Sequence, residues 1–309
     1  MIAIITINYN LSGETIPCVE SILKSEYPNY RVYLIDNGSA QDDYNKLLEA
    51  FNQQGKVNVL RIEKNCGYVG GVNFGLQKAM ESNPDYFLVM NNDTIIDKEA
   101  IGYLVYTAQR HKNNAIVSGK VYYYDRPDVL QHTGEIITDH RYLKTFAPGK
   151  NEKDTGQFDE EIERDALDDV FWLLPLGLVK DVGFYCNYFF LYAEQGDYAL
   201  RAKKKGYKLI YTPDAKLWHK VSMTTGGGNT HSPKVCYWRG QGLFVLHYRH
   251  LKIKYLILSI LKKFVTFSAL ALFKKENKRN CAIAMLRGYF WGFCWMFNKR
   301  PNNGYNPYN

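Results

Sequence analysis

Residues 2–10 of the chain read IAIITINYN, an apolar run that ends in three polar side chains. Residues 31–39 read RVYLIDNGS and repeat the same arrangement. Uninterrupted runs of Ile, Val, Leu and Tyr are typical of strands in a parallel sheet that is covered on both faces. The two stretches therefore predict buried strands, each followed by a polar turn.

Two more strands of this kind are expected within the first 120 residues, at Val57–Ile62 and Tyr86–Met90. Between the strands, apolar residues recur at three- and four-residue spacing, which indicates helices. The helices are expected at residues 15–25, 42–53, 69–81 and 98–110, with Ser12 and Ser39 capping two of them. This alternation predicts right-handed βαβ units, and hence an α/β fold with a mostly parallel sheet flanked by helices.

Polar residues follow all four strands: Asn8-Tyr9-Asn10, Asp36-Asn37-Gly38-Ser39, the stretch Asn65 to Asn73, and Asn91-Asn92-Asp93. Any one of these is explained by a turn, because Asn, Asp, Gly and Ser are the usual turn residues. Ligands of open parallel sheets, however, bind at the carboxyl ends of the strands. Four consecutive polar ends therefore favour a binding site at this edge.

The pattern becomes irregular from Ser118 to Asp169, and strand and helix signals return between residues 189 and 211. We assign residues 1–247 to one α/β domain, with halves at 1–120 and 121–247. Residues 248–309 are expected to form a basic, aromatic, helical region that is appended to it.

The net charge of +8 is spread unevenly over the 309 residues. Between Arg249 and Arg300 there are twelve Lys or Arg and one acid, Glu276, which gives +11 and leaves the rest of the chain near −3. Confinement of the positive charge to one segment argues against a nucleic-acid-binding protein.

The six cysteines are scattered, without a CxxC pair or the spacing of a zinc site. This favours buried thiols in a reducing compartment over disulfides. The chain begins directly with a strand-like run and has no charged leader, so no secretory signal is expected. The cytoplasm is the expected location.

Taken in order, these motifs resemble those of inverting glycosyltransferases of family 2, which have the GT-A fold, and are most similar to a bacterial rhamnosyltransferase-like branch. The resemblance extends from residue 1 to about residue 250. It rests on Thr6–Asn10, Leu34–Ser39, Asn65–Asn73, Asn91–Asp93, Glu194–Arg201, Gly206–Ala215 and His219.

The resemblance implies a nucleotide-sugar donor bound in the first half. The residues that it implies around the donor are Thr6, Asn8, Tyr9, Asn10, Asp36, Asn37, Asn65, Gly70, Gly71, Asn73 and Asn92. Asp36 accepts hydrogen bonds from a ring N–H or a ribose hydroxyl in this interpretation, and forms a strand-end turn in the alternative. Gly70 and Gly71 let backbone N–H groups approach a diphosphate, or simply make a turn.

Asn91-Asn92-Asp93 stands where the family has its Asp-x-Asp motif, which implies Mn²⁺ or Mg²⁺ as cofactor. Asp93 is the retained ligand, and Asn91 offers only a neutral contact. His219 matches a second protein ligand, and an imidazole favours Mn²⁺. The alternative for His219 is an ordinary core or surface residue.

The family's catalytic base is the second acid of a Glu-Asp or Asp-Asp pair. Here the segment reads Glu194-Gln195-Gly196-Asp197, and a glutamine is unable to act as a general base. Asp197 or Glu194 is the favoured substitute; alternatively the proton leaves through water, or the protein is inactive. Asp197 would also be explained as a helix cap that pairs with Arg201.

Residues 222–232 include three consecutive glycines and are expected to form either a lid over the donor or a plain surface loop. Downstream, Arg239 is a candidate for a phosphate contact or a surface ion pair.

The C-terminal region contains apolar runs at residues 251–261 and 264–273, split by Lys262-Lys263, and a third run at 281–297. No run reaches about twenty uncharged residues, so a membrane-spanning helix is not expected. Aromatic and aliphatic residues beside lysines favour helices on an anionic membrane surface. The alternative is a helical subdomain with a basic face, which would suit a homodimer contact.

The leading hypothesis is therefore a metal-dependent inverting glycosyltransferase. It would move a sugar from dTDP-rhamnose or a UDP-sugar to a growing, lipid-linked surface polysaccharide at the inner face of the cell membrane. A sugar-nucleotide nucleotidyltransferase would need a basic, Gly-rich loop after the first strand, and residues 8–12 offer none. The non-enzymatic alternative is a decayed relative that binds nucleotide sugars as a scaffold.

Overall fold

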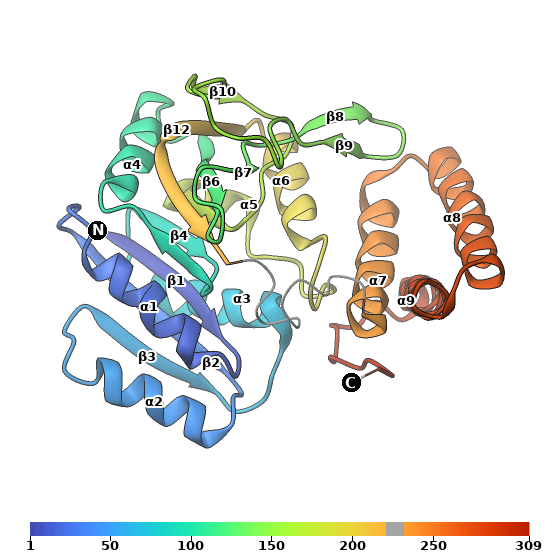
Figure 1. Ribbon diagram of the computed structural model, residues 1–309, viewed down its shortest axis with the longest axis horizontal. Helices are drawn as coiled ribbons and strands as arrows, with labels where there is room; N and C mark the ends of the chain where they lie inside the picture. Colours follow the sequence, from blue (N-terminus) through green and yellow to red (C-terminus); the bar gives the residue numbers. More distant parts are fainter. Residues whose placement is uncertain (221–231, 309) are drawn as a thin grey trace.

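The computed structural model describes residues 1–220 and 232–308 (Figure 1). Four parallel strands run side by side in the order β4-β1-β2-β3. They are β1 (Ile2–Asn8), β2 (Tyr30–Asn37), β3 (Val57–Ile62) and β4 (Tyr86–Met90). The helices between them are α1 (Ser12–Leu23), α2 (Gln41–Phe51) and α3 (Gly67–Met80). The predicted strands and their parallel arrangement are confirmed.

The sheet continues beyond β4 into the second half of the chain, in the order β10-β12-β6-β11-β4. β11 runs antiparallel to β4, and β12 runs parallel to β6. The bounds of these strands are β6 (Ala115–Tyr123), β10 (Ile162–Glu163), β11 (Phe171–Pro175) and β12 (Lys208–His219). Two short strands lie beside this order: β5 (Thr94–Ile96) pairs with β12, and β7 (Leu130–His132) pairs with β6. A separate hairpin consists of β8 (Ile136–Asp139) and β9 (Lys144–Phe146). The remaining helices around the sheet are α4 (Ala100–Arg110), α5 (Leu176–Val182) and α6 (Glu194–Lys204).

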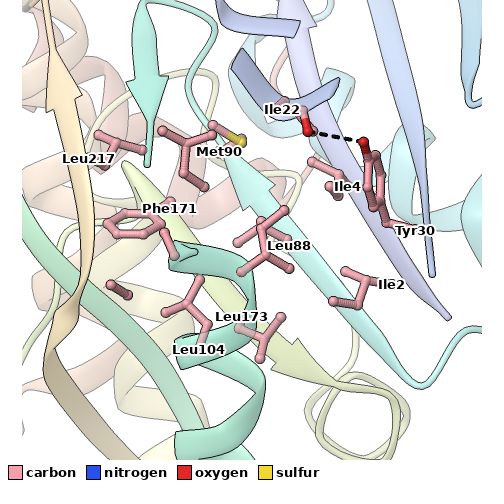
Figure 2. Close-up of a cluster of buried hydrophobic side chains, with 14 of the residues drawn as sticks. Ile2, Ile4, Ile22, Tyr30, Leu88, Met90, Leu104, Phe171, Leu173 and Leu217 are labelled. Atoms are coloured by element: carbon pink, nitrogen blue, oxygen red, sulfur yellow. Dashed lines mark hydrogen bonds between the residues drawn. The ribbon is translucent and has the colours of Figure 1, made fainter. Parts of the chain in front are cut away.

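The sheet is buried on both faces, as its continuous apolar strands require. Alternate residues of β1 enter different cores: Ile2 and Ile4 join one cluster, whereas Ala3 and Ile5 join the other. Figure 2 shows part of the first cluster, in which Leu88 of β4 lies among side chains from neighbouring strands and helices. The Tyr30 hydroxyl donates a hydrogen bond of 3.0 Å to the carbonyl of Ile22 at its margin.

The predicted serine caps are wrong. α1 begins at Ser12 itself, and α2 follows Ala40, which has no side chain to accept from the first turn. Asp43 instead accepts hydrogen bonds from the backbone N–H and the hydroxyl of Ser12, at 3.0 and 2.7 Å. A carboxylate from the second helix thus stabilises the start of the first, a tertiary contact that local sequence does not reveal.

The predicted domain boundary at residue 247 falls inside a helix, α7 (Pro233–His250). α7 packs against α9 (Glu276–Asn298), and α8 (Ile253–Phe273) lies on the outside of this bundle (Figure 1). The backbones of α7 and α9 meet closely, because a Cβ atom at Gly288 would overlap the Tyr237 carbonyl and one at Gly240 would overlap the Met285 carbonyl. The helical region therefore begins at residue 233 in space.

The two apolar runs at 251–261 and 264–273 form the single helix α8, which continues through Lys262 and Lys263. Within the described residues α8 is the one helix that is long and apolar enough to cross a membrane, with a mean hydropathy of 1.9 over its best window. The two runs thus join into one helix of spanning length, since a helix accommodates two lysines without ending. Length and composition alone do not make it a membrane span.

We predict that Leu88→Ala destabilises the protein by about 3 kcal/mol, because it leaves a cavity in the middle of a buried core. Ile136→Ala, at an exposed position of β8, is the control and should cost less than about 0.5 kcal/mol. Urea unfolding followed by circular dichroism measures both. Equal effects of the two substitutions would contradict the central place of β4.

Candidate active site

The carboxyl ends of β1 and β2 are joined by buried polar side chains. Asn8 and Asp36 are partners in the strand register, and the Asn8 amide donates to Asp36 Oδ1 at 3.0 Å and to Asp43 Oδ2 at 2.8 Å. The Asn8 Oδ1 accepts from the Thr15 hydroxyl at 2.8 Å. Asn8 and Asp36 are fully buried, so they form the floor of this edge and hold its shape.

The start of α3 is fixed against the end of β2. The Asn37 amide donates to the Gly67 carbonyl at 2.9 Å, and Asn65 Oδ1 accepts from the Gly67 N–H at 2.8 Å. Gly38 permits this approach, because it has φ +78° and a Cβ there would lie 2.5 Å from the Asn65 nitrogen. The N-terminus of a 14-residue helix is thereby held beside the strand ends, and the positive end of a helix dipole favours an anion.

The roles predicted for Gly70 and Gly71 are not supported by the structure. Both lie inside α3, not in a loop. A Cβ at Gly70 would lie 2.5 Å from the Cys66 sulfur, and one at Gly71 would lie 2.9 Å from a methyl group of Ile7. Gly71 therefore serves the packing of α3 on the sheet, whereas Gly70 leaves room for the Cys66 side chain at the start of the same helix.

The other residues predicted to bind the donor differ in whether their hydrogen-bonding groups are already paired within the protein. The Asn73 side-chain amide donates to the Tyr185 carbonyl and accepts from the Tyr185 N–H, at 2.9 Å each, so both of its groups are paired with the backbone. Asn92 donates to the Thr15 hydroxyl at 2.7 Å. Tyr9 is half-buried and Asn10 is exposed at the rim. Thr6 is buried, and its hydroxyl has no hydrogen-bond partner among the described residues.

Asp93 and His219 lie side by side, with His219 Nε2 at 3.1 Å from Asp93 Oδ1. The pairing of β5 with β12 causes this contact, because Thr94 is opposite His219 and the Lys220 N–H donates to the Asp93 carbonyl at 2.8 Å. The other ring nitrogen, Nδ1, lies 2.8 Å from Gln131 Oε1. A hydrogen bond donated from Nδ1 to Gln131 leaves the Nε2 lone pair directed at Asp93.

This pair fits a divalent cation. Two adjacent ligands of an octahedral ion with bonds of about 2.1 Å lie about 3 Å apart, which matches the Nε2–Oδ1 distance. No three His, Cys, Asp or Glu side chains gather into a metal cluster in the described part of the chain. An ion held by Asp93 and His219 would therefore take its other ligands from the donor diphosphate and water.

Asp197 is fully buried and surrounded by cations. Its carboxylate accepts from Arg201 at 2.9 Å and from Arg249 at 2.6 Å, and it lies 2.7 Å from His250 Nε2. Burial acts to raise its pKa, but hydrogen bonding by His250 and the charges of Arg201 and Arg249 outweigh it and lower the pKa to about 2. A carboxylate held this way is a poor proton acceptor, so the structure argues against Asp197 as the base.

Glu194 is also buried, but without a cation. One of its carboxyl oxygens has no hydrogen-bond partner among the described residues. Burial, followed by the charge of Asp169, raises the pKa of Glu194 well above its ordinary range. Such a shift favours the protonated form, so this carboxyl is a weaker candidate for the base than a carboxylate that is open to solvent.

Two acids that the sequence analysis did not single out, Asp168 and Asp169, face Glu194. Phe171 of β11 pairs with Met90 of β4, and the Asn91 N–H donates to the Val170 carbonyl at 2.9 Å, so the two acids lie at the same edge as Asp93. Burial and the charge of Asp168 raise the pKa of Asp169 to about 7. Their signal was present as the acidic stretch ending at residue 169, but only the antiparallel return of β11 brings it to the site.

A cavity of about 190 Å³ opens beside these acids, between the β8–β9 hairpin and the start of α6. Asp168 and Gln195 both line it, together with Glu135, Asp165 and Leu246. A larger hollow of about 660 Å³ lies at the opposite edge of the sheet, around Tyr86 and Pro175. This hollow lies at the amino end of β4, whereas the polar residues of the candidate site lie at the carboxyl ends of the strands.

The predicted lid at residues 222–232 lies almost wholly outside the described residues, as only Ser232 is described. Arg239, the candidate for a phosphate contact, lies over the ring of Tyr192 with its guanidinium carbon 5.0 Å from the ring centre.

Several known proteins are similar to this chain in sequence. A family model described as "Glycosyl transferase family 2" matches residues 3–170. The "Glycosyltransferase GlyG" of Streptococcus pneumoniae serotype 4 is 31% identical over 129 residues, which are 41% of each chain. The "Poly-beta-1,6-N-acetyl-D-glucosamine synthase" of Staphylococcus epidermidis is 23% identical over 219 residues, 71% of this chain and 50% of that protein. The chain thus spans half or less of these relatives' own lengths.

Solved structures share the fold. S. aureus TarS 1-349 matches with a TM-score of 0.56 and 15% identity, over 94% of this chain and 80% of that one. GalNAc-T7, crystallised with UDP, GalNAc and Mn2+, matches with a TM-score of 0.62 and 13% identity, over 97% of this chain and 57% of that one. The predicted GT-A architecture is confirmed.

We predict that Asp197→Asn destabilises the protein by about 2 to 3 kcal/mol at neutral pH, less than for a fully buried ion pair because Arg201 and Arg249 keep some exposure. A lowered pKa stabilises the fold above the unfolded pKa near 4, and this stabilisation is lost as the pH falls through about 2. Wild type and variant should therefore converge in acid.

Urea unfolding at several pH values measures this difference. Asp139→Asn, which breaks an exposed ion pair with Arg141, is the control and should change stability by less than about 0.5 kcal/mol. A pH-independent gap between wild type and Asp197→Asn would contradict the assigned pKa.

Proposed function

The chain belongs to glycosyl transferase family 2, and we propose that it transfers a sugar, with inversion, from a nucleoside-diphosphate donor to a glycan acceptor. One observation supports this most directly. The polar ends of β1 and β2, the Asp93–His219 pair and the acids before β11 share one edge of the sheet. Donor binding, metal binding and proton removal would thus occur next to one another.

The proposed donor is dTDP-rhamnose or a UDP-sugar, and the proposed acceptor is a growing, lipid-linked surface polysaccharide. The motif order of the rhamnosyltransferase-like branch supports the first donor. The second is supported by two similar proteins: one is named a poly-N-acetylglucosamine synthase, and one was crystallised with UDP. The nucleoside would contact the open rim at Tyr9 and Asn10, with the free hydroxyl of Thr6 beneath it.

Asp93 and His219 would hold the cation, and the N-terminus of α3 would face the diphosphate. When bound, the cation neutralises the negative charge that grows on the leaving diphosphate. Gln131 contributes by orienting the His219 ring, because its contact with Nδ1 fixes which nitrogen is free. Both metal ligands are buried, so they are held in place before the donor arrives.

Asp168 is the proposed base in place of the missing carboxylate at position 195. It is half-buried, and it lines the same cavity as Gln195. An acceptor hydroxyl in that cavity would have access to Asp168, whereas Asp197 is enclosed by Arg201 and Arg249, and burial raises the pKa of Glu194. In this proposal a carboxylate still removes the acceptor proton, but it comes from the segment before β11 and not from the family position in α6.

The proposed step balances as follows. The acceptor oxygen forms a bond to the anomeric carbon as its proton moves to the Asp168 carboxylate. The bond between that carbon and the diphosphate oxygen breaks on the opposite face, and the nucleoside diphosphate leaves with the bonding electrons. Glu194, whose pKa is raised by burial, takes no part in the proposed transfer.

A decayed, sugar-nucleotide-binding relative is the second candidate, and Asn91 and Gln195 are the observations that favour it. Both positions lack the acid that the family motif would have there. Formation of glycosylated product distinguishes the two candidates, because a scaffold would bind the donor without consuming it.

We predict that UDP- or dTDP-sugars raise the thermal unfolding temperature of the protein only when Mn²⁺ or Mg²⁺ is present, since a ligand of the native state stabilises it. Asp93→Asn should abolish this metal-dependent shift. Asp42→Asn, at an exposed position of α2, should leave it intact. A full shift with Asp93→Asn would remove Asp93 from the metal site.

We predict that Asp168→Asn lowers kcat by about 100-fold or more while donor stabilisation persists, because a general base contributes about that much. Glu135→Gln, which alters another acid of the same cavity, should keep most activity.

Adding Gln195→Asp to Asp168→Asn should restore part of the lost rate, because it returns an acid to the family position. Wild-type turnover with an unaffected Asp168→Asn variant would refute Asp168 as the base and leave the proposed function standing. Donor binding without any wild-type product would instead favour the scaffold.

A further inference from the structure

α8 exposes a continuous apolar face. Six of its large apolar side chains are between 52% and 75% exposed: Ile253, Ile257, Leu261, Phe264, Val265 and Leu272. At 100° per residue these six positions fall within about 120° of the helix circumference. Exposed apolar area of this extent on one face is a sign of an interaction surface.

The opposite face of α8 is already occupied by the protein. Leu256, Ser259 and Phe267 are buried, and the Ser259 hydroxyl lies 2.9 Å from His247 Nδ1 on α7. Phe267 packs edge-on against Tyr289 of α9, with ring centres 6.3 Å apart. α8 is therefore attached to the bundle along one side, and its outer side is turned away from the described chain (Figure 1).

Positive charge surrounds the apolar face. Lys252 and Lys254 lie at the start of α8, Lys262 lies beside the face at mid-helix, and Lys274, Lys275, Lys278 and Arg279 follow its end. The one acid between Arg249 and Arg300 is Glu276. The fitting partner is both apolar and anionic.

A second copy of the chain does not meet this requirement. A two-fold contact would bring the same patch to itself and so place the lysines of one copy against those of the other. An anionic bilayer does meet it, because its acyl region accepts the apolar side chains and its headgroups accept the lysines.

We propose that α8 lies flat in the headgroup region of an anionic membrane and holds the enzyme at its inner face. The length of α8, 21 residues, would suffice for a span of about 31 Å. A spanning helix, however, would have to give up Phe267, Ser259 and the rest of its packing on α7 and α9. The flat orientation buries the free face and keeps these contacts, and it stands independently of the proposed reaction.

The test uses the full chain, because removal of residues 249–309 would also remove Arg249 and His250 from buried Asp197. Sedimentation with phosphatidylcholine vesicles, with and without phosphatidylglycerol, measures binding. We expect binding to the anionic vesicles that is at least about tenfold stronger than to the neutral ones. Equal binding to both, or no binding to either, would overturn the proposal.

The decisive variant is the pair Leu261→Asp and Val265→Asp, which places two charges in the centre of the exposed face. It should lower vesicle binding about tenfold or more, while the unfolding temperature and the donor-induced shift stay unchanged. Tyr106→Asp, an exposed aromatic position of α4, is the matched control and should bind like wild type. Unchanged binding by the double variant would refute α8 as the membrane contact.

Light scattering in the absence of vesicles tests the other occupant. A monomer in both proteins agrees with the membrane proposal. A wild-type dimer that the double variant dissociates would show that a second copy covers this face, and would overturn it. Flat insertion is distinguished from spanning by a protease added outside sealed vesicles, which should leave no protected fragment of α8.

Discussion

A buried carboxylate links the two parts of this molecule, beside the apolar side chains that pack between them. Asp197 stands in the first turn of α6, and two of its three partners, Arg249 and His250, come from the end of α7. The same turn of α6 contains Glu194 and Gln195, which face the acids before β11. The position of the site on the sheet and the position of the helical bundle therefore depend on one another. Since an unpaired charge in this place is costly, neither part is free to shift alone.

Much of the fold follows from the sequence, because its strands are continuous apolar runs with polar ends. Parallel strands buried on both faces leave little choice of pattern, and β1 to β4 appear where that pattern predicts them. The second half was harder to predict for a physical reason. β11 runs antiparallel to β4, so residues 168 and 169, which precede it, lie at the edge where the parallel strands end. A pattern of alternating strands and helices predicts only the residues that follow a parallel strand at this edge. The position of β11 depends on pairing with β4, which no local pattern records.

The candidate site shows the same division. Polar residue types at the strand ends predicted that these side chains gather at one edge, and Asp93 and His219 meet there, as the motif resemblance implies. The sequence did not reveal which of these side chains already have hydrogen-bond or packing partners within the fold. Asn73 is hydrogen-bonded to the backbone of Tyr185, Gly71 packs against Ile7, and Asp197 pairs with Arg201, Arg249 and His250, so each already has partners within the fold. Whether a polar group is free to bind a ligand depends on partners far away in the sequence, as for Asp197 and Arg249, which are more than fifty residues apart.

The glycines between α7 and α9 have a mechanical consequence. Backbone against backbone is a contact with no side chains to rotate or compress, so the bundle is stiff where Gly240 and Gly288 let the two helices touch. Any change in the angle between α7 and α9 would have to pass through this contact, so the two helices are expected to move as one body. Because α7 ends at the contacts of Arg249 and His250 with Asp197, such a body would carry the start of α6 with it.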